Sequence, residues 1–234
     1  MEGRLDPLRF REAAARRRVG RQLAAVFVWA AAFALAEAAV VIYLRRIFHP
    51  GGFQFPLQPR PYDPILGVEI AREAATLVML AAVGWLADRR AWARFGHVMV
   101  AFGTWDIFYY AWLWVFLGWP PSLATLDVLF LIPMMWVGPV WAPVLVSLGL
   151  VACGVAVALR VGAGGPFSLG RRGWAMALAG GLLIAASFVW RGEEAARGEM
   201  PGAFPWPIFL AGYALGLWAF ARAWLGAEEG PERN

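Results

Sequence analysis

Ionisable residues interrupt two stretches of this chain that are otherwise hydrophobic enough to cross a membrane. Glu69, Arg72 and Glu73 lie in the first of these stretches, and Asp106 lies in the second. An ionised side chain at the centre of a bilayer costs at least about 2.5–3.5 kcal/mol, so such residues usually face one another or a wet cavity. Carboxyl groups in that setting can carry protons, bind cations or act as general acids and bases. The sequence therefore predicts a polar site inside a membrane protein.

Helical spacing groups these side chains on two faces. Residues 69, 72, 73 and 76 are three or four positions apart, so Glu69, Arg72, Glu73 and Thr76 share one helical face. Arg72 can bridge either carboxylate with its fork of donors. The same spacing aligns a second face, formed by Gly103, Asp106, Tyr109, Tyr110 and Leu113. Both faces are expected to point toward the other helices.

The depth of these residues predicts an outward-facing pocket. With a rise of 1.5 Å per residue, Glu37 and Glu73 lie roughly 9–10 Å inward from the outer ends of their helices. Asp106 lies roughly 16 Å inward. The expected lining of the pocket is Glu37, Glu69, Arg72, Glu73, Asp106, Tyr109 and Tyr110. Its expected rim is Arg45, Arg46, His49 and Asp127.

The charges within the predicted spans do not balance. Glu37, Glu69, Glu73 and Asp106 are four acids, and Arg72 is the only basic residue at comparable depth. At least one of these acids should therefore be protonated, bind a cation, or pair with an Arg at the rim. The alternative interpretation is structural, with the polar residues forming an ion-pair network that holds the helices in register.

Sites that require other residue patterns are not expected. The chain has two histidines and no Glu-x-x-His pair, which disfavours a haem or di-metal centre. Cys153 is the only cysteine, so a CxxC metal site is excluded. The serines lack a G-x-S-x-G context, and GAGG at 162–165 is not followed by Lys, as a phosphate-binding loop requires. We expect no metal, no cofactor and no nucleic-acid partner.

Composition indicates that the polar site is carried by membrane-spanning helices. Of the 234 residues, 61% are hydrophobic and 16% are charged, unlike an ordinary soluble domain. Each predicted span has about the length needed to cross the hydrocarbon. The predicted spans are 23–44, 67–87, 96–117, 139–159, 173–190 and 207–225. The predicted fold class is an all-α integral membrane protein with six transmembrane helices. In the last two, Ala177/Gly181 and Gly212/Gly216 are small-residue pairs that permit close helix contact.

Arginine distribution predicts the orientation. Residues 1–22 hold seven Arg, which suggests either a basic amphipathic helix on an anionic lipid surface or a positively charged flank of the first span. With the N-terminus inside, 15 Arg fall on the cytoplasmic side and five on the other. We therefore expect a bacterial cytoplasmic-membrane protein with both termini inside. The expected organisation is a cytoplasmic segment 1–22, one domain at 23–225 and a cytoplasmic tail at 226–234.

Two connections have unusual composition. Residues 47–64 contain five prolines and four aromatic residues, which predicts a packed, lid-like loop on the outer side. In residues 118–138, Pro120 and Pro121 end the third span, and Ser122 can cap a short helix that Pro133 interrupts. We expect residues 123–137 to form a broken or re-entrant half-helix before the fourth span.

Three classes of function fit these features. The first is a small proton- or cation-linked transporter or conduit that uses Glu37, Glu73 and Asp106 as carriers, with Arg72 tuning them. The second is a non-catalytic subunit or assembly factor with membrane-protein partners or a homo-oligomeric state. The third is an intramembrane enzyme acting on a lipid-linked substrate, with Arg45 and Arg46 holding a phosphate.

Overall fold

Six long helices form a bundle of the kind that spans a membrane. The computed structural model describes residues 7–57 and 65–226. Its elements are α1 (Pro7–Phe48), α2 (Leu66–Ala87), α3 (Ala91–Leu117), β1 (Leu126–Phe130), β2 (Trp136–Pro139), α4 (Trp141–Gly162), α5 (Gly170–Val189), α6 (Gly192–Ala196) and α7 (Trp206–Gly226). All except α6 and the two strands are long and apolar enough to cross a bilayer, which confirms the prediction of six spanning helices in a multi-pass membrane protein.

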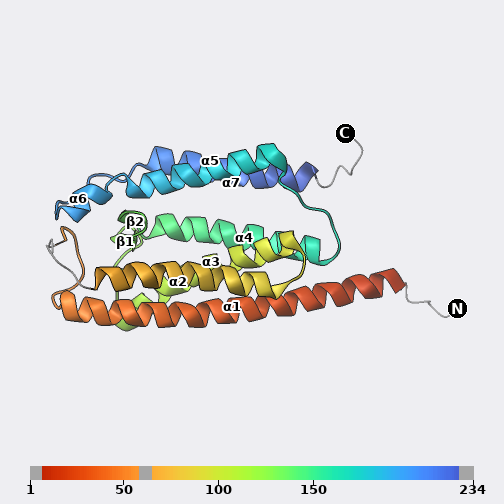
Figure 1. Cartoon of the computed structure of the whole chain (residues 1–234), viewed down its shortest axis with the longest axis horizontal. Helices are drawn as coiled ribbons and strands as arrows, with labels where there is room; N and C mark the ends of the chain where they lie inside the picture. Colours follow the sequence, from red (N-terminus) through yellow and green to blue (C-terminus); the bar gives the residue numbers. More distant parts are fainter. Residues whose placement is uncertain (1–6, 58–64, 227–234) are drawn as a thin grey trace.

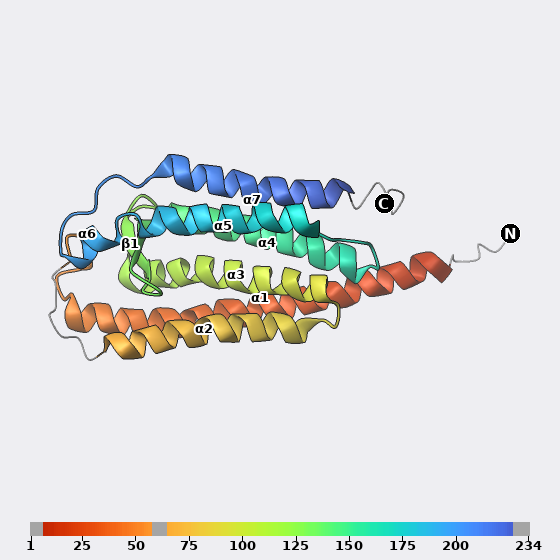
Figure 2. The ribbon, with the colours of Figure 1, turned by 45° about the horizontal axis from the view of Figure 1, so that its top comes forward.

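The helices run side by side, and the two ends of the bundle differ. One end carries the strands, α6 and the connection after α1, whereas the chain enters and leaves at the opposite end (Figures 1 and 2). We call these the hairpin end and the terminal end. Helix α1 has 42 residues and is about 63 Å long, so it extends well beyond the roughly 30 Å of bilayer hydrocarbon. It has no break near residue 22, and the tail 227–234 lies outside the described residues.

Helix α3 is the centre of the first half of the bundle and packs on α1, α2 and α4. Glycines allow the closest of these contacts. A Cβ atom on Gly103 would lie 2.5 Å from the backbone oxygen of Ser147 on α4, and one on Gly96 would lie 2.7 Å from that of Gly154. Across the α2–α3 contact, a Cβ on Gly84 would meet the backbone of Val98. Any side chain at these positions would push the helices apart.

Helices α5 and α7 form a separate pair that makes few contacts with α4. Their closest approach is at Gly180, where an added Cβ atom would lie 2.7 Å from the backbone oxygen of Gly212. The expected contact at Ala177 and Gly181 is therefore displaced by one position, because a Cβ on Gly181 would meet nothing within 4 Å. On α7, the contact falls at Gly212, a member of the second predicted small-residue pair.

The predicted half-helix at 123–137 is wrong, because this segment is a β-hairpin. Strand β1 pairs antiparallel with β2, with a bulge between Val128 and Phe130. Pro133 falls at the chain reversal, and the apolar and β-branched residues around it favour strands. Backbone groups beyond the strands are also satisfied, since Val140 N–H donates to the Thr125 carbonyl at 3.0 Å. The hairpin adds a short β-sheet to a fold that is otherwise helical.

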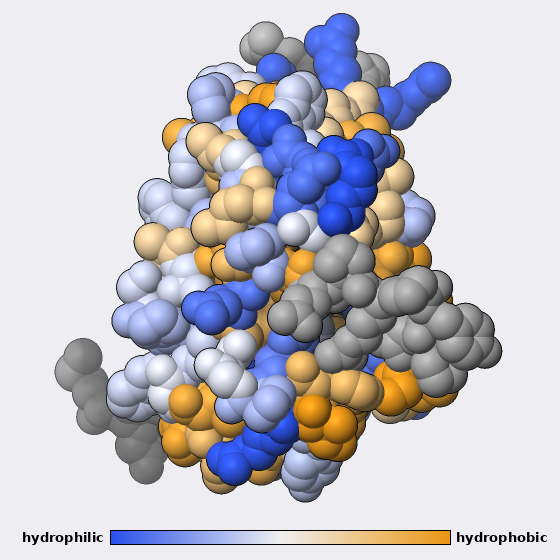
Figure 3. All heavy atoms as spheres, turned by 90° about the vertical axis from the view of Figure 1, so that its left-hand side faces the viewer, coloured by the Kyte–Doolittle hydropathy of each residue, from blue (hydrophilic) through white to orange (hydrophobic). Residues whose placement is uncertain are grey.

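Aromatic side chains pack the hairpin end. The Phe53 ring, in the connection after α1, lies 5.9 Å from the Trp119 ring in the connection after α3. The first part of the predicted lid is thus packed on the protein, whereas residues 58–64 of it lie outside the described residues. Figure 3 views this end directly and shows hydrophilic and hydrophobic side chains interspersed over it.

Candidate functional site

Arg72 links two helices through two carboxylates. Its guanidinium lies on α2 and makes an ion pair with Glu37 on α1. It also pairs with Glu69, one turn away on its own helix, at 2.8 Å. Thr76 donates a hydrogen bond of 2.9 Å to the other oxygen of Glu37. These four side chains form a tie between α1 and α2.

The buried face of α2 brings Glu73 under the hairpin. Glu73 and Thr76 are buried, as are Leu80 and Gly84 farther along the same face. The spacing of three to four residues is that of one helical face, and neighbouring positions such as Val78 are exposed. A carboxylate oxygen of Glu73 accepts a hydrogen bond of 2.9 Å from the backbone N–H of Leu131, just beyond β1. Among the described residues, Glu73 has no ion-pair partner within 4 Å.

Asp106 is held between α3 and α4. It is buried, and its carboxylate accepts a hydrogen bond of 2.8 Å from the Ser147 hydroxyl on α4. The close approach at Gly103, one turn away, brings the α4 backbone near enough for this contact. Within the described part of the chain, no basic side chain lies within 4 Å of Asp106.

Glu73 and Asp106, which have no basic partner among the described residues, line the same small cavity. This cavity has a volume of about 40 Å³, room for at least one water molecule. Hairpin residues Leu129 and Phe130 form part of its wall. The remaining lining residues are Glu37, Val41, Arg72, Glu73, Thr76, Trp105, Asp106, Tyr109 and Tyr110. We call this space the carboxyl cavity.

Arg45 and Asp127 form a separate buried ion pair beside the carboxyl cavity. Their side chains are 2.8 Å apart, and Asp127 is 0% exposed. The Arg45 guanidinium also lies over the rings of Trp119 and Phe53, at 3.7 and 4.3 Å from their centres. Burial raises the pKa of Asp127 to about 6, although Arg45 acts in the opposite direction.

The structure thus brings most of the predicted site residues together. Six of the seven expected lining residues border the carboxyl cavity, and the seventh, Glu69, contacts it through Arg72. The expected rim is arranged differently. Arg45 and Asp127 are buried against each other, Arg46 is exposed, and His49 is half-buried with its ring 5.3 Å from that of Phe53.

Two contributors to the site were not identified from the sequence. The first is Ser147 on α4, which lies seven residues before Gly154. On α3, Gly96 and Gly103 are also seven residues apart, and Gly103 faces Ser147 while Gly96 faces Gly154. Small residues at such matched spacing are a sequence signal for a close helix contact. The second, the N–H of Leu131, has no sequence signal, because any residue but proline could supply it.

A metal ion is not supported by the grouping of side chains. Among the described residues, no cluster of three or more His, Cys, Asp or Glu side chains is arranged to hold one. His97 is fully buried, and its Nδ1 lies 2.7 Å from the Ala93 carbonyl oxygen on the same helix. It therefore lies in the helix packing and does not line the carboxyl cavity.

Comparison with known proteins found no matching family model, no matching curated protein and no matching solved structure. Function is therefore inferred from the contacts within the carboxyl cavity. The feature to explain is a pair of buried carboxyl groups, on different helices, that have hydrogen-bond donors but no basic side chain within 4 Å among residues 7–57 and 65–226.

Proposed function

We propose that this protein is a small proton-linked transporter or proton conduit, in which Glu73 and Asp106 hold the transported proton. The observation that supports this function is that both carboxyl groups line one cavity of about 40 Å³, and neither has a basic side chain within 4 Å in the described part of the chain. Two ionised carboxylates that share a buried site repel each other and lose their hydration. The site therefore favours a state in which at least one of them carries a proton.

The contacts of Arg72 support the assignment of the proton to Glu73 and Asp106. It is already engaged by Glu37 and Glu69, so its charge is shared by two acids before Glu73 and Asp106 are considered. The size of the cavity favours a proton over a divalent cation, because calcium binds about 6–8 oxygen ligands and magnesium usually keeps several waters. Glu37 can act as a third acceptor at the same cavity.

Proton binding at Glu73 would also affect the hairpin. The ionised carboxylate is the stronger acceptor for the N–H of Leu131, which is 2.9 Å away. Protonation weakens this hydrogen bond and loosens the contact between the hairpin and α2. We propose that this change opens the carboxyl cavity toward the hairpin end, which would face the outside of a bacterial cytoplasmic membrane.

The two alternatives make different use of the same contacts. A subunit or assembly factor with membrane-protein partners is favoured by the Arg72 tie, which joins α1 and α2 without requiring transport. An enzyme acting on a lipid-linked substrate is less favoured, because Arg45 is paired with Asp127, which leaves Arg46 as the exposed member of the two arginines expected to hold a phosphate. Under each function, the basic segment 1–22 would contact anionic lipid on the cytoplasmic side.

Proton flux into liposomes tests the proposal. Purified protein is reconstituted with a pH-sensitive dye inside, and a pH gradient and membrane potential are imposed. We expect Glu73→Gln and Asp106→Asn each to reduce proton flux at least tenfold, because each removes one proton-binding group. Glu193→Gln is the control, since it removes an exposed acid on α6 that does not line the cavity. We expect it to retain most of the flux.

A second measurement tests proton binding without transport. Infrared difference spectra between acidic and basic pH should show a carboxylic acid band that is altered in Glu73→Gln or Asp106→Asn and retained in Glu193→Gln. Two results together would contradict the proposal: a wild-type flux no greater than that of empty liposomes, and a carboxylic acid band that neither substitution alters. The subunit interpretation would then be the better one.

A further inference from the structure

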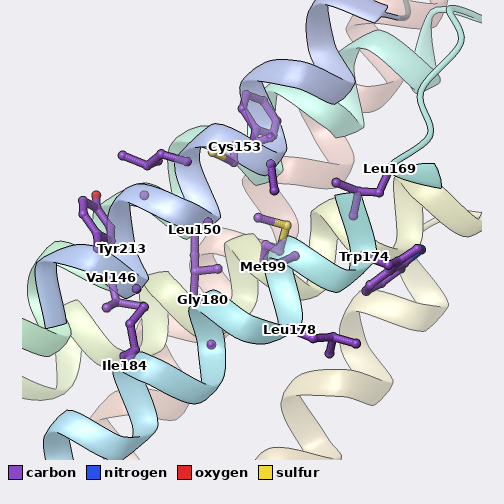
Figure 4. A pocket seen from close by; sticks show the side chains of 18 of the residues that line it. Met99, Val146, Leu150, Cys153, Leu169, Trp174, Leu178, Gly180, Ile184 and Tyr213 are labelled. Atoms are coloured by element: carbon purple, nitrogen blue, oxygen red, sulfur yellow. The ribbon is translucent and has the colours of Figure 1, made fainter. Parts of the chain in front are cut away.

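A second, apolar cavity lies between the two halves of the bundle and shares no lining residue with the carboxyl cavity. It has a volume of about 420 Å³ and separates the α5–α7 pair from α3 and α4 (Figure 4). Met99, Leu150, Cys153 and Leu178 line it, and the small residue Gly181 leaves part of it open. Ligand pockets in proteins commonly have volumes of about 300–1,000 Å³, so this cavity is large enough for part of a small amphipathic molecule.

This cavity continues into a basic one at the terminal end. The adjoining cavity has a volume of about 690 Å³ and shares Phe167, Leu169 and Ala219 with the apolar one. Two arginines line it: Arg172 at the start of α5 and Arg222 near the end of α7. Apolar and basic surfaces are therefore continuous.

The two arginines are available for a ligand. Both are exposed, and neither makes an ion pair or side-chain hydrogen bond with any residue in the described part of the chain. Arg160 differs, since its guanidinium donates to the Trp224 carbonyl at 3.1 Å and lies over the Trp224 ring. A guanidinium is well suited to bind phosphate oxygens in pairs.

We propose that this composite site binds an anionic glycerophospholipid from the leaflet at the terminal end. Its phosphate would bind Arg172 and Arg222, and one acyl chain would fill the apolar cavity. The argument for this occupant is complementarity: an apolar chamber at bilayer depth opens beside two arginines at its surface. Neutral lipid lacks the net negative charge that these arginines attract. The lipid would join the α5–α7 pair to the rest of the bundle, a role independent of proton transport.

Native mass spectrometry of the full-length protein tests lipid selectivity. Phosphatidylglycerol or phosphatidylcholine is added to the purified protein, and retained lipid is counted. We expect wild type to prefer phosphatidylglycerol, with a loss of about fivefold in affinity for each Arg removed and about twenty-fivefold for Arg172→Gln/Arg222→Gln. Arg171→Gln is the matched control, because Arg171 is also exposed but does not line either cavity.

A probe inside the apolar cavity tests where the chain lies. Cys153 is the only cysteine and lines this cavity, so a bimane label on it can be quenched by spin-labelled acyl chains. We expect stronger quenching by spin-labelled phosphatidylglycerol than by spin-labelled phosphatidylcholine. Gly181→Leu should reduce this difference and the number of retained lipids, since a Leu side chain would occupy the cavity without striking the backbone.

Several results would overturn the proposal. Equal retention of the two lipids by wild type would do so, as would an Arg171→Gln effect as large as that of the double variant. A dimer that Gly181→Leu disrupts, with no lipid retained, would assign the cavity to a second copy of the chain. If the double variant fails to fold, Arg222→Gln alone should still show the fivefold loss, and the absence of that loss would count against the site.

Discussion

Within the carboxyl cavity, the acidic residues differ in the group that compensates their charge. Glu37 has a guanidinium and a threonine hydroxyl, Glu73 has a backbone N–H, and Asp106 has a serine hydroxyl. Hydrogen bonds from neutral donors stabilise a carboxylate less than an ion pair does. Of these three acids, only Glu37 has an ion pair among the described residues, so Glu73 and Asp106 are the groups proposed to hold the proton.

Removal of Arg72 should destabilise the protein. In Arg72→Gln, Glu37 and Glu69 would remain with side chains only 7% and 14% exposed and no cation, and we expect a loss of about 3 kcal/mol. Unfolding in detergent micelles measures this change. Arg197→Gln is the control, because its ion pairs are more than half exposed and exposed ion pairs add little to stability.

A second substitution checks that interpretation. Glu37→Gln in the Arg72→Gln background should restore part of the stability, because it removes one of the two uncompensated charges. An Arg72→Gln protein as stable as wild type would contradict the assignment of Arg72 as the tie between α1 and α2.

Asp127 should make stability depend on pH in the mildly acidic range. Burial raises the pKa of Asp127 to about 6, whereas an Asp in an unfolded chain has a pKa near 3.9. Between about pH 4 and 6, the folded state therefore binds a proton that the unfolded state does not. Stability should rise by about 2 kcal/mol as the pH falls from 6 to 4. Asp127→Asn should abolish this contribution, as measured by unfolding at a series of pH values.

Asp88 provides a control, because its effect on the pH dependence of stability has the opposite sign to that of Asp127. Its hydrogen bonds with Arg90 hold the pKa of Asp88 well below its usual range. Its contribution to stability is therefore present above about pH 4 and is lost as the pH falls further. Asp88→Asn should leave the Asp127 contribution between pH 4 and 6 in place, and a profile flattened equally by both substitutions would contradict the assignment.

At the scale of elements, the close contact of α3 and α4 sets the position of Ser147 relative to Asp106. Gly103→Ala would place a Cβ atom 2.5 Å from the Ser147 backbone oxygen, so the two helices must separate. We expect a loss of about 1–3 kcal/mol. Gly181→Ala is the matched control, because a Cβ there meets nothing within 4 Å. Unfolding of both variants measures the difference, and equal stabilities would contradict the packing argument.

The spanning helices were predictable because length and hydropathy decide them. The second span was expected at 67–87 and is observed at Leu66–Ala87. The hairpin was not predictable in the same way. Residues 126–130 form a short segment that is apolar except for Asp127. Such a segment is compatible with either a helix or a strand, and the choice depends on pairing with Trp136–Pro139. Pairing partners are a property of the folded chain and not of either segment alone.

The same distinction applies to the site. Glu69, Arg72 and Glu73 were placed on one face because helical spacing is a local property. Ser147 and the N–H of Leu131 were missed because their positions depend on how α4 and the hairpin pack against α2 and α3. The burial of Arg45 with Asp127 likewise joins residues 82 positions apart.

On the scale of the whole molecule, both chain ends emerge at one end of the bundle, and arginine counts predict that this end is cytoplasmic (Figure 1). In a Cys153→Ser background, a cysteine at Met200, which is 65% exposed at the hairpin end, should react with a membrane-impermeant maleimide on intact cells. A cysteine at Ser168, exposed at the terminal end, should react only after the membrane is permeabilised. The reverse labelling pattern would contradict the proposed orientation.

The division of the bundle into α1–α4 and α5–α7 has a consequence for biosynthesis. All side chains of the carboxyl cavity precede Trp141 in the sequence, and Ser147 completes their contacts. Helix α5 begins only at Gly170, so the ribosome adds about 60 more residues over several seconds before α7 is finished. The first four helices can therefore assemble their polar contacts in the membrane while the last pair is still being made. Errors in α5 or α7 would then lower the yield of mature protein through a late docking step, without preventing the polar site from forming.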